Sequence, residues 1–288
     1  MIENLNLYKN RDVDIFIYSH IPFRPVTTDH TYKILTNSHL SPKYFNTDLE
    51  IIRDYTGDNI SDKNLLFNEY SGFYWLWKNY PLKDYIGLNH YRRMYCDDSK
   101  NVLEFGNMPD INKIFETNRI ILNKPFKLIV ASKTKPSYIL NNKDWYALWH
   151  NIDDFNKMKE VVNEKYPQYM DGWEKMEKAE YLYNSSLFTM NKECFLEYCE
   201  FIFDILNTYC DEMGFHSNDD CIKYVEERKD IYIHPERSPY NVTKQARIVG
   251  YLAERVLAAF LMHGGDNSLE THSHIFNWAM VPKTMYEV

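Results

Sequence analysis

The first hundred residues alternate short apolar runs with longer amphipathic stretches. Residues 13–19, VDIFIYS, and residues 31–38, TYKILTNS, combine β-branched and aromatic residues and predict two strands. Residues 64–80 place apolar side chains at positions 66, 70, 73, 77 and 80, the spacing of one helical face, and Pro81 ends this helix. Residues 84–91, DYIGLNHY, predict another strand. Strand, helix and strand in alternation are typical of an α/β sheet with helical crossovers.

The pattern becomes mostly helical in the second half of the chain. A helix is predicted at 110–118 and a strand at 119–123, whereas the basic, proline-containing segment 125–145 fits neither pattern. Further helices are predicted at 144–166, 169–179, 192–213 and 243–262, with one strand at 181–191. The chain contains no internal repeat or obvious linker. We therefore expect a single domain over residues 1–288, with an α/β half at 1–143 and a helix-rich half at 144–288.

The composition is typical of a soluble protein from a reducing compartment. Hydrophobic residues make up 44% of the 288 residues, and no apolar run reaches the roughly 18 residues that a membrane span needs. The first residues are partly acidic and do not resemble a signal peptide. The five cysteines form no CxxC motif, which favours reduced, buried thiols. These features predict a cytoplasmic protein.

Charge and aromatic content narrow the class of ligand. The net charge of −8 argues against a general nucleic-acid binder. The chain has 24 Tyr, 16 Phe and 6 Trp, whose flat faces and polar edges suit the recognition of sugars or bases. An AT-rich genome would also enrich Tyr, together with Asn, Lys and Ile, so composition by itself does not decide between the two explanations.

A cluster of polar and basic residues lies at the end of the predicted strand at 84–91. Its members are His90, Tyr91, Arg92 and Arg93. Ligands of open α/β sheets bind beyond the carboxyl ends of the strands, and guanidinium groups match phosphate oxygens. The cluster therefore predicts a diphosphate site. The alternative is a solvated loop in which the two arginines pair with Asp97 and Asp98.

Two other polar groups are candidates for binding sugar hydroxyls. One is the loop formed by Thr56, Gly57, Asp58 and Asn59, which equally fits a plain turn. The other is Glu69, a carboxylate within the aromatic helix at 64–80. Glu69 either pairs with a buried arginine or binds a hydroxyl group of a sugar.

Candidate catalytic residues cluster where YALWH runs into a new helix. His150 and Asp153 each offer a group that could deprotonate a hydroxyl, and Glu180 is a third choice. Asp153 is equally well placed to cap the helix that follows. Glu254 and Arg255 stand within a strongly apolar helix, so each is expected to have a buried partner.

Five segments in this order resemble a bacterial family of capsular and exopolysaccharide glycosyltransferases. The family was first catalogued as a domain of unknown function, DUF4422, and some members are galactofuranosyltransferases. The segments are TGDNIS (56–61), NEYSGFYWLWKN (68–79), DYIGLNHYRR (84–93), YALWHNIDDF (146–155) and QARIVGYLAERVL (245–257). The resemblance extends from residue 14 to about residue 262.

The resemblance implies a glycosyltransferase A-like fold, with a Rossmann-like sheet that binds a nucleotide sugar in residues 1–143 and an acceptor side in residues 144–288. In that fold the strand after the aromatic helix usually ends in Asp-x-Asp, which holds a divalent metal on the diphosphate. Here the corresponding residues are His90, Tyr91 and Arg92. Fixed cations would then neutralise the leaving diphosphate without a bound metal ion. Mn²⁺ or Mg²⁺ held by Asp97 and Asp98 remains the alternative.

The implied reaction is the transfer of a sugar, with UDP-galactofuranose as the best single donor, to a growing capsular, exopolysaccharide or O-antigen glycan. Two other functions fit a basic strand end or an aromatic surplus: a phospho- or sulfotransferase, and a non-catalytic module that binds glycans or nucleotides. Peripheral contact with the inner face of the cytoplasmic membrane is expected if residues 274–288 lie at an interface through Phe276, Trp278, Met280 and Tyr286. Alternatively, this segment packs on the domain as a strap.

Overall fold

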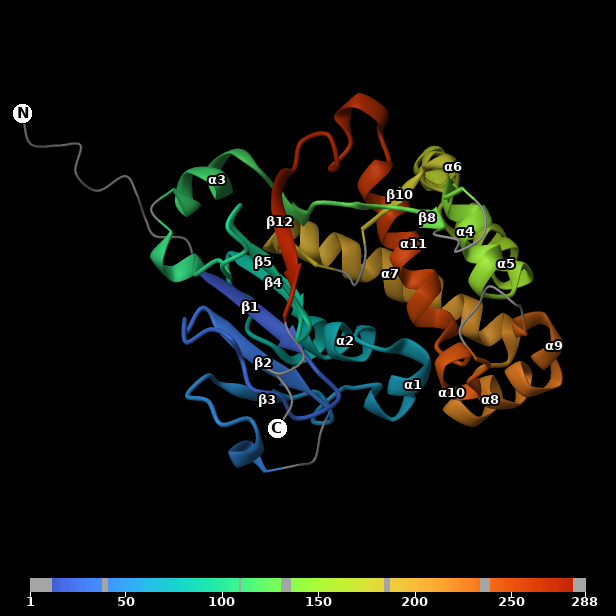
Figure 1. The fold of residues 1–288 in the computed structure, drawn as a ribbon, viewed down its shortest axis with the longest axis horizontal. Coiled ribbons are helices and arrows are strands. Elements are labelled where there is room, and N and C mark those ends of the chain that lie inside the picture. Colours follow the sequence, from blue (N-terminus) through green and yellow to red (C-terminus); the bar gives the residue numbers. More distant parts are fainter. Residues whose placement is uncertain are drawn as a thin grey trace, which may run out of the picture.

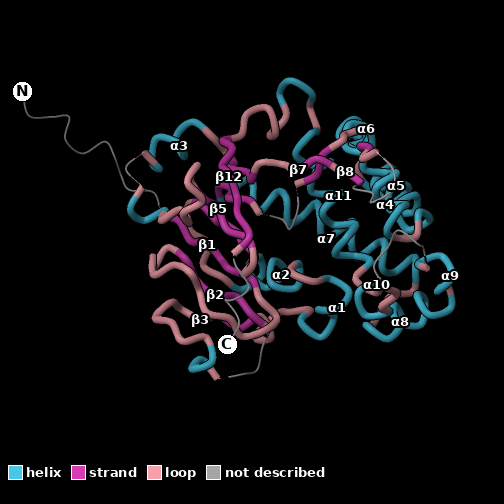
Figure 2. The backbone as a smooth tube through the Cα atoms, viewed as in Figure 1, coloured by secondary structure: helices cyan, strands magenta, loops and turns pink. Residues whose placement is uncertain are grey.

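The protein has a mixed α/β fold in which the strands gather on one side and most helices on the other (Figures 1 and 2). This computed structural model describes residues 12–37, 41–108, 110–130, 136–183, 187–233 and 239–281. The strands are β1 (Val13–Tyr18), β2 (Tyr32–Thr36), β3 (Ile51–Arg53), β4 (Tyr85–His90), β5 (Arg93–Cys96), β6 (Ile120–Asn123), β7 (Phe126–Lys127), β8 (Ile129–Val130), β9 (Tyr138–Ile139), β10 (Tyr181–Leu182), β11 (Phe188–Asn191) and β12 (His274–Met280). The helices are α1 (Asn64–Phe67), α2 (Tyr70–Asn79), α3 (Ile111–Thr117), α4 (Asn142–Trp149), α5 (Ile152–Lys165), α6 (Met170–Lys178), α7 (Lys192–Met213), α8 (Asn218–Glu227), α9 (Lys229–Tyr232), α10 (Val242–Gln245) and α11 (Ile248–Met262).

Eight strands form the main sheet, which has an open half and a closed half. In the open half β3, β2, β1 and β4 are parallel neighbours. A parallel α/β sheet was predicted, but β3 was not assigned from the sequence, and α-helices occur only in the connection from β3 to β4. In the other half β11 pairs antiparallel with both β4 and β6, and β12 joins β6 to β5. The pair formed by His90 and Arg93 links β5 back to β4. These strands close into a small barrel-like ring, which the sequence pattern did not predict.

Alternating residues of the strands enter two separate cores. Phe16 and Tyr18 of β1 pack into a large core with the helices, whereas Ile15 and Ile17 pack into a smaller core on the opposite face. All four side chains are at most 4% exposed. A strand that is buried on both faces appears as a continuous apolar run, which is why residues 15–18 are hydrophobic or aromatic.

The helix predicted at 64–80 is interrupted at Asn68. Asn68 has a φ of 52°, which ends α1, and Glu69 stands at the start of α2. The Asn64 side chain stabilises the break by donating a hydrogen bond to the Asn68 carbonyl oxygen at 2.8 Å. The break brings Glu69 to the edge of the parallel strands, where an unbroken helix would have a different register.

Two further predicted helices are also divided. The helix predicted at 144–166 forms α4 and α5, with His150 and Asn151 between them. The helix predicted at 243–262 forms α10 and α11, with Ala246 and Arg247 between them. Each break places a polar side chain at a helix end, and both His150 and Arg247 line cavities that are described below.

Residues 274–280 form β12, inserted between β5 and β6. The segment is thus part of the sheet up to Met280, which favours the strap interpretation over a free interfacial segment; Tyr286 lies outside the described residues. β5 and the short strands β7, β8 and β9 were likewise not assigned from the sequence. Within the described residues no helix is long and apolar enough to cross a membrane, and all five cysteines are buried free thiols.

Candidate functional site

A basic cavity of about 510 Å³ lies at the carboxyl ends of β1 and β4. Its walls come from these strand ends, from α1 and the start of α2, and from α10 and α11. The lining residues are Tyr18, His20, Asn64, Leu65, Asn68, Glu69, His90, Arg92, Arg93, Lys244, Arg247, Gly250, Tyr251 and Glu254. This edge of a parallel sheet is the usual ligand site in α/β folds.

The turn between β4 and β5 presents Arg92 and Arg93 to the basic cavity. The Arg92 backbone N–H donates to Nδ1 of His90 at 3.1 Å, and the Val281 N–H donates to the Arg92 carbonyl oxygen at 2.9 Å. The turn is therefore held from both sides. Nε of Arg92 is buried and donates to no described partner, and Arg92 forms no ion pair within the described part of the chain.

A third arginine in the cavity was not predicted from the sequence. Arg247 follows α10, and its Nε is also buried without a hydrogen-bond partner among the residues that the structure describes. A buried donor that lacks an acceptor costs roughly 1–3 kcal/mol. Two such donors in one cavity indicate a ligand rich in acceptor oxygens.

The two histidines of the basic cavity are neutral donors or acceptors rather than cations. Burial, followed by the nearby Arg92 and Arg93, lowers the pKa of His90 well below its usual range. Burial, followed by Arg247 and Arg92, also lowers the pKa of His20. The sequence interpretation counted His90 as a potential cation, and the arginines beside it make that charge unfavourable.

The fixed charges of the cavity leave an excess of positive charge. Arg92, Arg93, Lys244 and Arg247 provide four cations, whereas Glu69 and Glu254 provide two carboxylates. Burial, followed by repulsion from Glu254, raises the pKa of Glu69 to about 7, although Arg93 and Arg247 oppose the rise. Near neutral pH, protonation of Glu69 therefore makes the cavity more positive.

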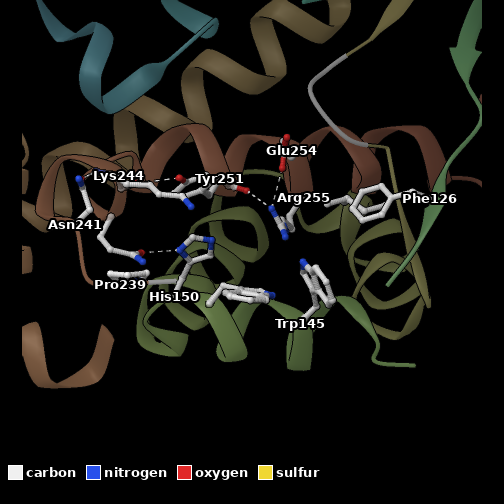
Figure 3. A pocket seen from close by; sticks show the side chains of 12 residues that line it. Phe126, Trp145, His150, Pro239, Asn241, Lys244, Tyr251, Glu254 and Arg255 are labelled. Carbon is white, nitrogen blue, oxygen red and sulfur yellow. Dashed lines mark hydrogen bonds and ion pairs between the residues drawn. The ribbon is translucent and has the colours of Figure 1, made fainter. Parts of the chain in front are cut away.

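An aromatic cavity of about 440 Å³ adjoins the basic cavity (Figure 3). Its lining residues are Phe126, Trp145, Trp149, His150, Leu182, Pro239, Asn241, Lys244, Gln245, Tyr251, Glu254 and Arg255. His150 stacks on Tyr251 with ring centroids 4.2 Å apart, and its Nδ1 lies 3.0 Å from Oε1 of Gln245. The predicted residue His150 thus lines this cavity and not the basic one.

Three residues belong to both cavities: Lys244, Tyr251 and Glu254. Glu254 accepts a hydrogen bond from Nη1 of Arg255 at 3.0 Å, and the same Nη1 donates to the Tyr251 carbonyl oxygen at 2.9 Å. Arg255 is only 3% exposed, and a buried partner was expected for it from the sequence. Glu254 is that partner. Arg247, Tyr251 and Glu254 are separated by four and three residues, the spacing of one helical face. This spacing is the sequence feature that could have predicted that the three residues line the same wall.

The loop at 56–59 lies outside both cavities. Asp58 N–H donates to Oδ1 of Asn79 at 3.1 Å, and Nδ2 of Asn79 donates back to the Asp58 carbonyl oxygen at 2.7 Å. Trp75 donates to the Thr56 carbonyl oxygen, and Asn59 donates to that of Gly57. The loop therefore closes onto α2 as a turn, and the structure does not bring it to Glu69 or Arg92.

Asp153 is exposed in the first turn of α5 and lines neither cavity. It is not the helix cap, because the side chain of Asn151 accepts the Asp153 N–H at 3.1 Å. The neighbouring Asp154 is buried and accepts hydrogen bonds from Tyr209 and Tyr224. Burial raises the pKa of Asp154 to about 6, against the effect of the two tyrosine hydroxyls.

Asp97 and Asp98 lie at the far end of β5, which runs away from the basic cavity. Asp97 accepts hydrogen bonds from Asn101, and Asp98 accepts one from Asn277. Neither aspartate forms an ion pair with Arg92 in the described chain. Among the residues that the structure describes, no group of three His, Cys, Asp or Glu is suited to a metal ion.

Comparisons with known proteins identify a family for this chain and a solved structure with a similar fold. The solved apo structure of WbbM, a bifunctional glycosyltransferase, superposes with a TM-score of 0.68 at 24% sequence identity. The match covers 95% of this chain and 46% of WbbM, so the chain spans about half the length of that protein. Among curated proteins none matches. The family model described as a domain of unknown function, DUF4422, matches residues 14–228, and the chain therefore belongs to the DUF4422 family.

Proposed function

We propose that this protein is a glycosyltransferase that binds the diphosphate of a nucleotide sugar in its basic cavity. The observation that carries the proposal is the pair of buried, unpartnered Nε donors of Arg92 and Arg247 at the carboxyl edge of the parallel strands. A diphosphate offers the acceptor oxygens that these donors lack. The description of WbbM as a glycosyltransferase supports the same reaction class, and the glycosyltransferase A-like assignment is proposed from the family resemblance.

The charges of the cavity suit a diphosphate diester. Four cations face two carboxylates, and Glu69 is partly protonated near neutral pH, so the cavity has an excess of positive charge to meet the two negative charges of the diphosphate. During transfer, negative charge grows on the departing oxygen, and preorganised cations stabilise that charge more than they stabilise the bound donor. Arg92 and Arg93 in the tight turn after β4 are the groups best held for this task.

The same residues do not fit a divalent cation. Mg²⁺ and Mn²⁺ prefer carboxylate and other oxygen ligands, whereas here two carboxylates stand among four cations. Asp97 and Asp98, the alternative ligands, are at the far end of β5. We therefore propose that fixed cations neutralise the leaving diphosphate.

The donor and acceptor are proposed from the family resemblance. UDP-galactofuranose is the first donor to test, and a growing capsular, exopolysaccharide or O-antigen glycan is the acceptor class. A screen should compare UDP-galactofuranose, UDP-galactopyranose, UDP-glucose and UDP-N-acetylhexosamines by release of UDP. Release from one donor, accelerated by a glycan acceptor, is the expected result.

A phospho- or sulfotransferase is the second candidate, because unpartnered arginines would serve its donor equally well. Calorimetric titration with UDP and with a sulfonucleotide separates the two. Tighter binding of the sulfonucleotide, with no release of UDP from any UDP-sugar, would replace the proposed function with this one.

A further inference from the structure

We propose that the aromatic cavity binds a sugar unit of the acceptor and that Glu254 accepts the proton of the attacking hydroxyl. The inference rests on the proposed function, and it adds where the second substrate lies and which side chain acts on it. Four features of the aromatic cavity carry it: its rings, its unpartnered donors, its charge and the residues that it shares with the basic cavity.

Aromatic rings form one wall of the cavity. Phe126 of β7 and Trp145 of α4 have ring centroids 6.5 Å apart, and Trp149 follows at 5.8 Å from Trp145. All three are half-buried, so part of each ring faces the cavity. Sugar rings present C–H faces that pack on aromatic rings, while their hydroxyls reach the polar edges. The volume of about 440 Å³ lies within the range of about 300–1,000 Å³ that small-molecule sites occupy.

Two donors in this cavity have no described acceptor. Nε of Arg255 is buried without a hydrogen-bond partner among the described residues, although the side chain is only 3% exposed. Nε1 of Trp149 is also buried without a hydrogen-bond partner among the described residues. Figure 3 shows Arg255 at the cavity wall, between Glu254 and Trp145. A hydroxyl group supplied by a ligand would satisfy such donors.

The charge of the aromatic cavity distinguishes its ligand from that of the basic cavity. Arg255 is already balanced by Glu254 through the 3.0 Å contact, so Lys244 at the border is the remaining cation of the lining. A neutral, hydroxyl-rich ring fits this setting better than a second diphosphate. The chemical class is therefore a hexose unit of a glycan.

The shared wall places Glu254 where two bound substrates would meet. Tyr251 and Glu254 are three residues apart on α11, so they lie on one face of the helix, and both line each cavity. A donor with its diphosphate against Arg92 and an acceptor ring against Trp149 would bring their reacting atoms to this wall. Asp153, the earlier candidate, lies outside both cavities.

The proposed step uses the Glu254 carboxylate as a general base. The acceptor oxygen bonds to the anomeric carbon of the donor while its proton passes to Glu254. The bond between that carbon and the diphosphate oxygen breaks, and its electron pair leaves with the nucleoside diphosphate. Attack from the side opposite the leaving group inverts the anomeric centre. Nη1 of Arg255 orients the carboxylate, and His150, stacked on Tyr251 and bound to Gln245, positions the wall.

The first experiment tests the cavity by measuring the binding of octyl hexosides to the UDP-loaded protein by saturation-transfer NMR. Trp149→Ala should weaken the binding of at least one hexoside about threefold to tenfold, the range expected for a lost ring contact. Trp149→Phe should restore part of it, and UDP affinity should stay within twofold of wild type. Trp75→Phe is the control, because Trp75 contacts the loop at 56–59 and lines neither cavity. It should bind the hexosides as wild type does. Equal hexoside binding by wild type and Trp149→Ala would overturn the assignment, as would no binding by wild type.

The second experiment compares Glu254→Gln with the exposed-carboxylate control Glu174→Gln in the release of UDP from the active donor. Glu254→Gln should lose roughly 10²–10⁴ in turnover, because a general base is removed, while UDP affinity in the same sample confirms a folded donor site. Glu254→Asp keeps the carboxylate on a shorter side chain and should leave intermediate activity. Turnover within threefold of wild type for Glu254→Gln would remove Glu254 from the role.

The two levels of the proposal fail in different ways. A wild-type protein that neither binds UDP nor releases it from any donor contradicts the proposed function and, with it, this inference. A protein that binds UDP and transfers sugar, but whose Trp149→Ala and Glu254→Gln variants behave as wild type, keeps the function and loses only the acceptor site.

Discussion

Asn68 packs against Gly250 so closely that a Cβ atom at Gly250 would overlap the Asn68 side-chain amide. This contact joins the break between α1 and α2 to the first turn of α11, and residues of both elements line the basic cavity. Glu69 follows Asn68 directly, so the position of its carboxylate depends on this contact.

Gly250→Ala should destabilise the protein by about 1–3 kcal/mol, the usual cost of overpacking a close contact, and should weaken UDP binding because the cavity wall moves. Chemical denaturation and calorimetry give the two quantities. Asn68→Ala removes the obstructing amide, so the double variant should regain part of the loss. Strictly additive effects of the two substitutions would show that the contact does not constrain the wall.

Arg92→Ala should lower turnover by roughly 10²–10³ and affect donor binding less, because the growing charge of the leaving group needs a preorganised donor. Arg92→Lys should not restore full activity, since an ammonium group cannot reproduce the guanidinium fork. Steady-state release of UDP measures both. Arg119→Ala, whose side chain pairs with Glu197 on the surface, is the control and should act as wild type. Loss of stability without loss of turnover in the folded fraction would assign Arg92 a structural role.

The affinity for a UDP-sugar should fall as the pH rises through about 7. Glu69 has its pKa raised to about 7, so it is neutral below this pH and repels the diphosphate above it. The diphosphate of a UDP-sugar is a diester and keeps its charge over this range, whereas free UDP does not. Calorimetry at pH 6 and pH 8 should show the change, and Glu69→Gln should abolish it. A pH dependence that survives in Glu69→Gln must have another origin.

Asp154→Asn should gain stability relative to wild type as the pH rises from 5 to 7. The folded state raises the pKa of Asp154 to about 6, above its usual value of 3.8, so folding favours the protonated form. That contribution is complete below the usual value and is lost as the pH rises through about 6. The expected difference between the two pH values is about 1 kcal/mol in the free energy of unfolding. Glu164→Gln, an exposed change on the same helix, should leave the profile unchanged.

Incubation with EDTA should leave transferase activity intact, because four cations of the basic cavity already neutralise the diphosphate. Assays of release of UDP before and after dialysis against EDTA test this directly. Abolition of activity, with rescue by Mn²⁺ or Mg²⁺, would contradict the role of the fixed cations and direct attention to the oxygen ligands near the donor.

The open half of the fold was predictable, since β1, β2 and β4 are buried on both faces and therefore appear as apolar runs. The basic turn at Arg92 was predictable for the same reason, because it follows a strand whose end the pattern identifies. The helix breaks at Asn68 and at His150 were not, since each depends on tertiary contacts: Asn68 on Gly250, and His150 on Gln245 and Tyr251.

The position of Glu254 between the basic and aromatic cavities was not predicted from the sequence, for a related reason. Along the sequence, Glu254 lies in an apolar helix, and a buried ion pair with Arg255 is a sufficient explanation. Only the fold shows that α11 runs between two cavities, with one helical face lining both. Conversely, Asp58 and Asp153 are candidate site residues by sequence, but neither lines a cavity. The Asp58 backbone is hydrogen-bonded to Asn79, and Asp153 is exposed.

The insertion of β12 between β5 and β6 has a consequence for the order of folding. β12 comprises residues 274–280, whereas its partners lie at 93–96 and 120–123, so the ring cannot close until these distant segments meet. Pairings over such long separations form slowly, and until then β5 and β6 expose strand edges that can pair with other chains. During synthesis the open parallel half has all its strands long before β12 emerges. The barrel-like half is therefore expected to be the last part to fold and the main source of aggregation in truncated chains.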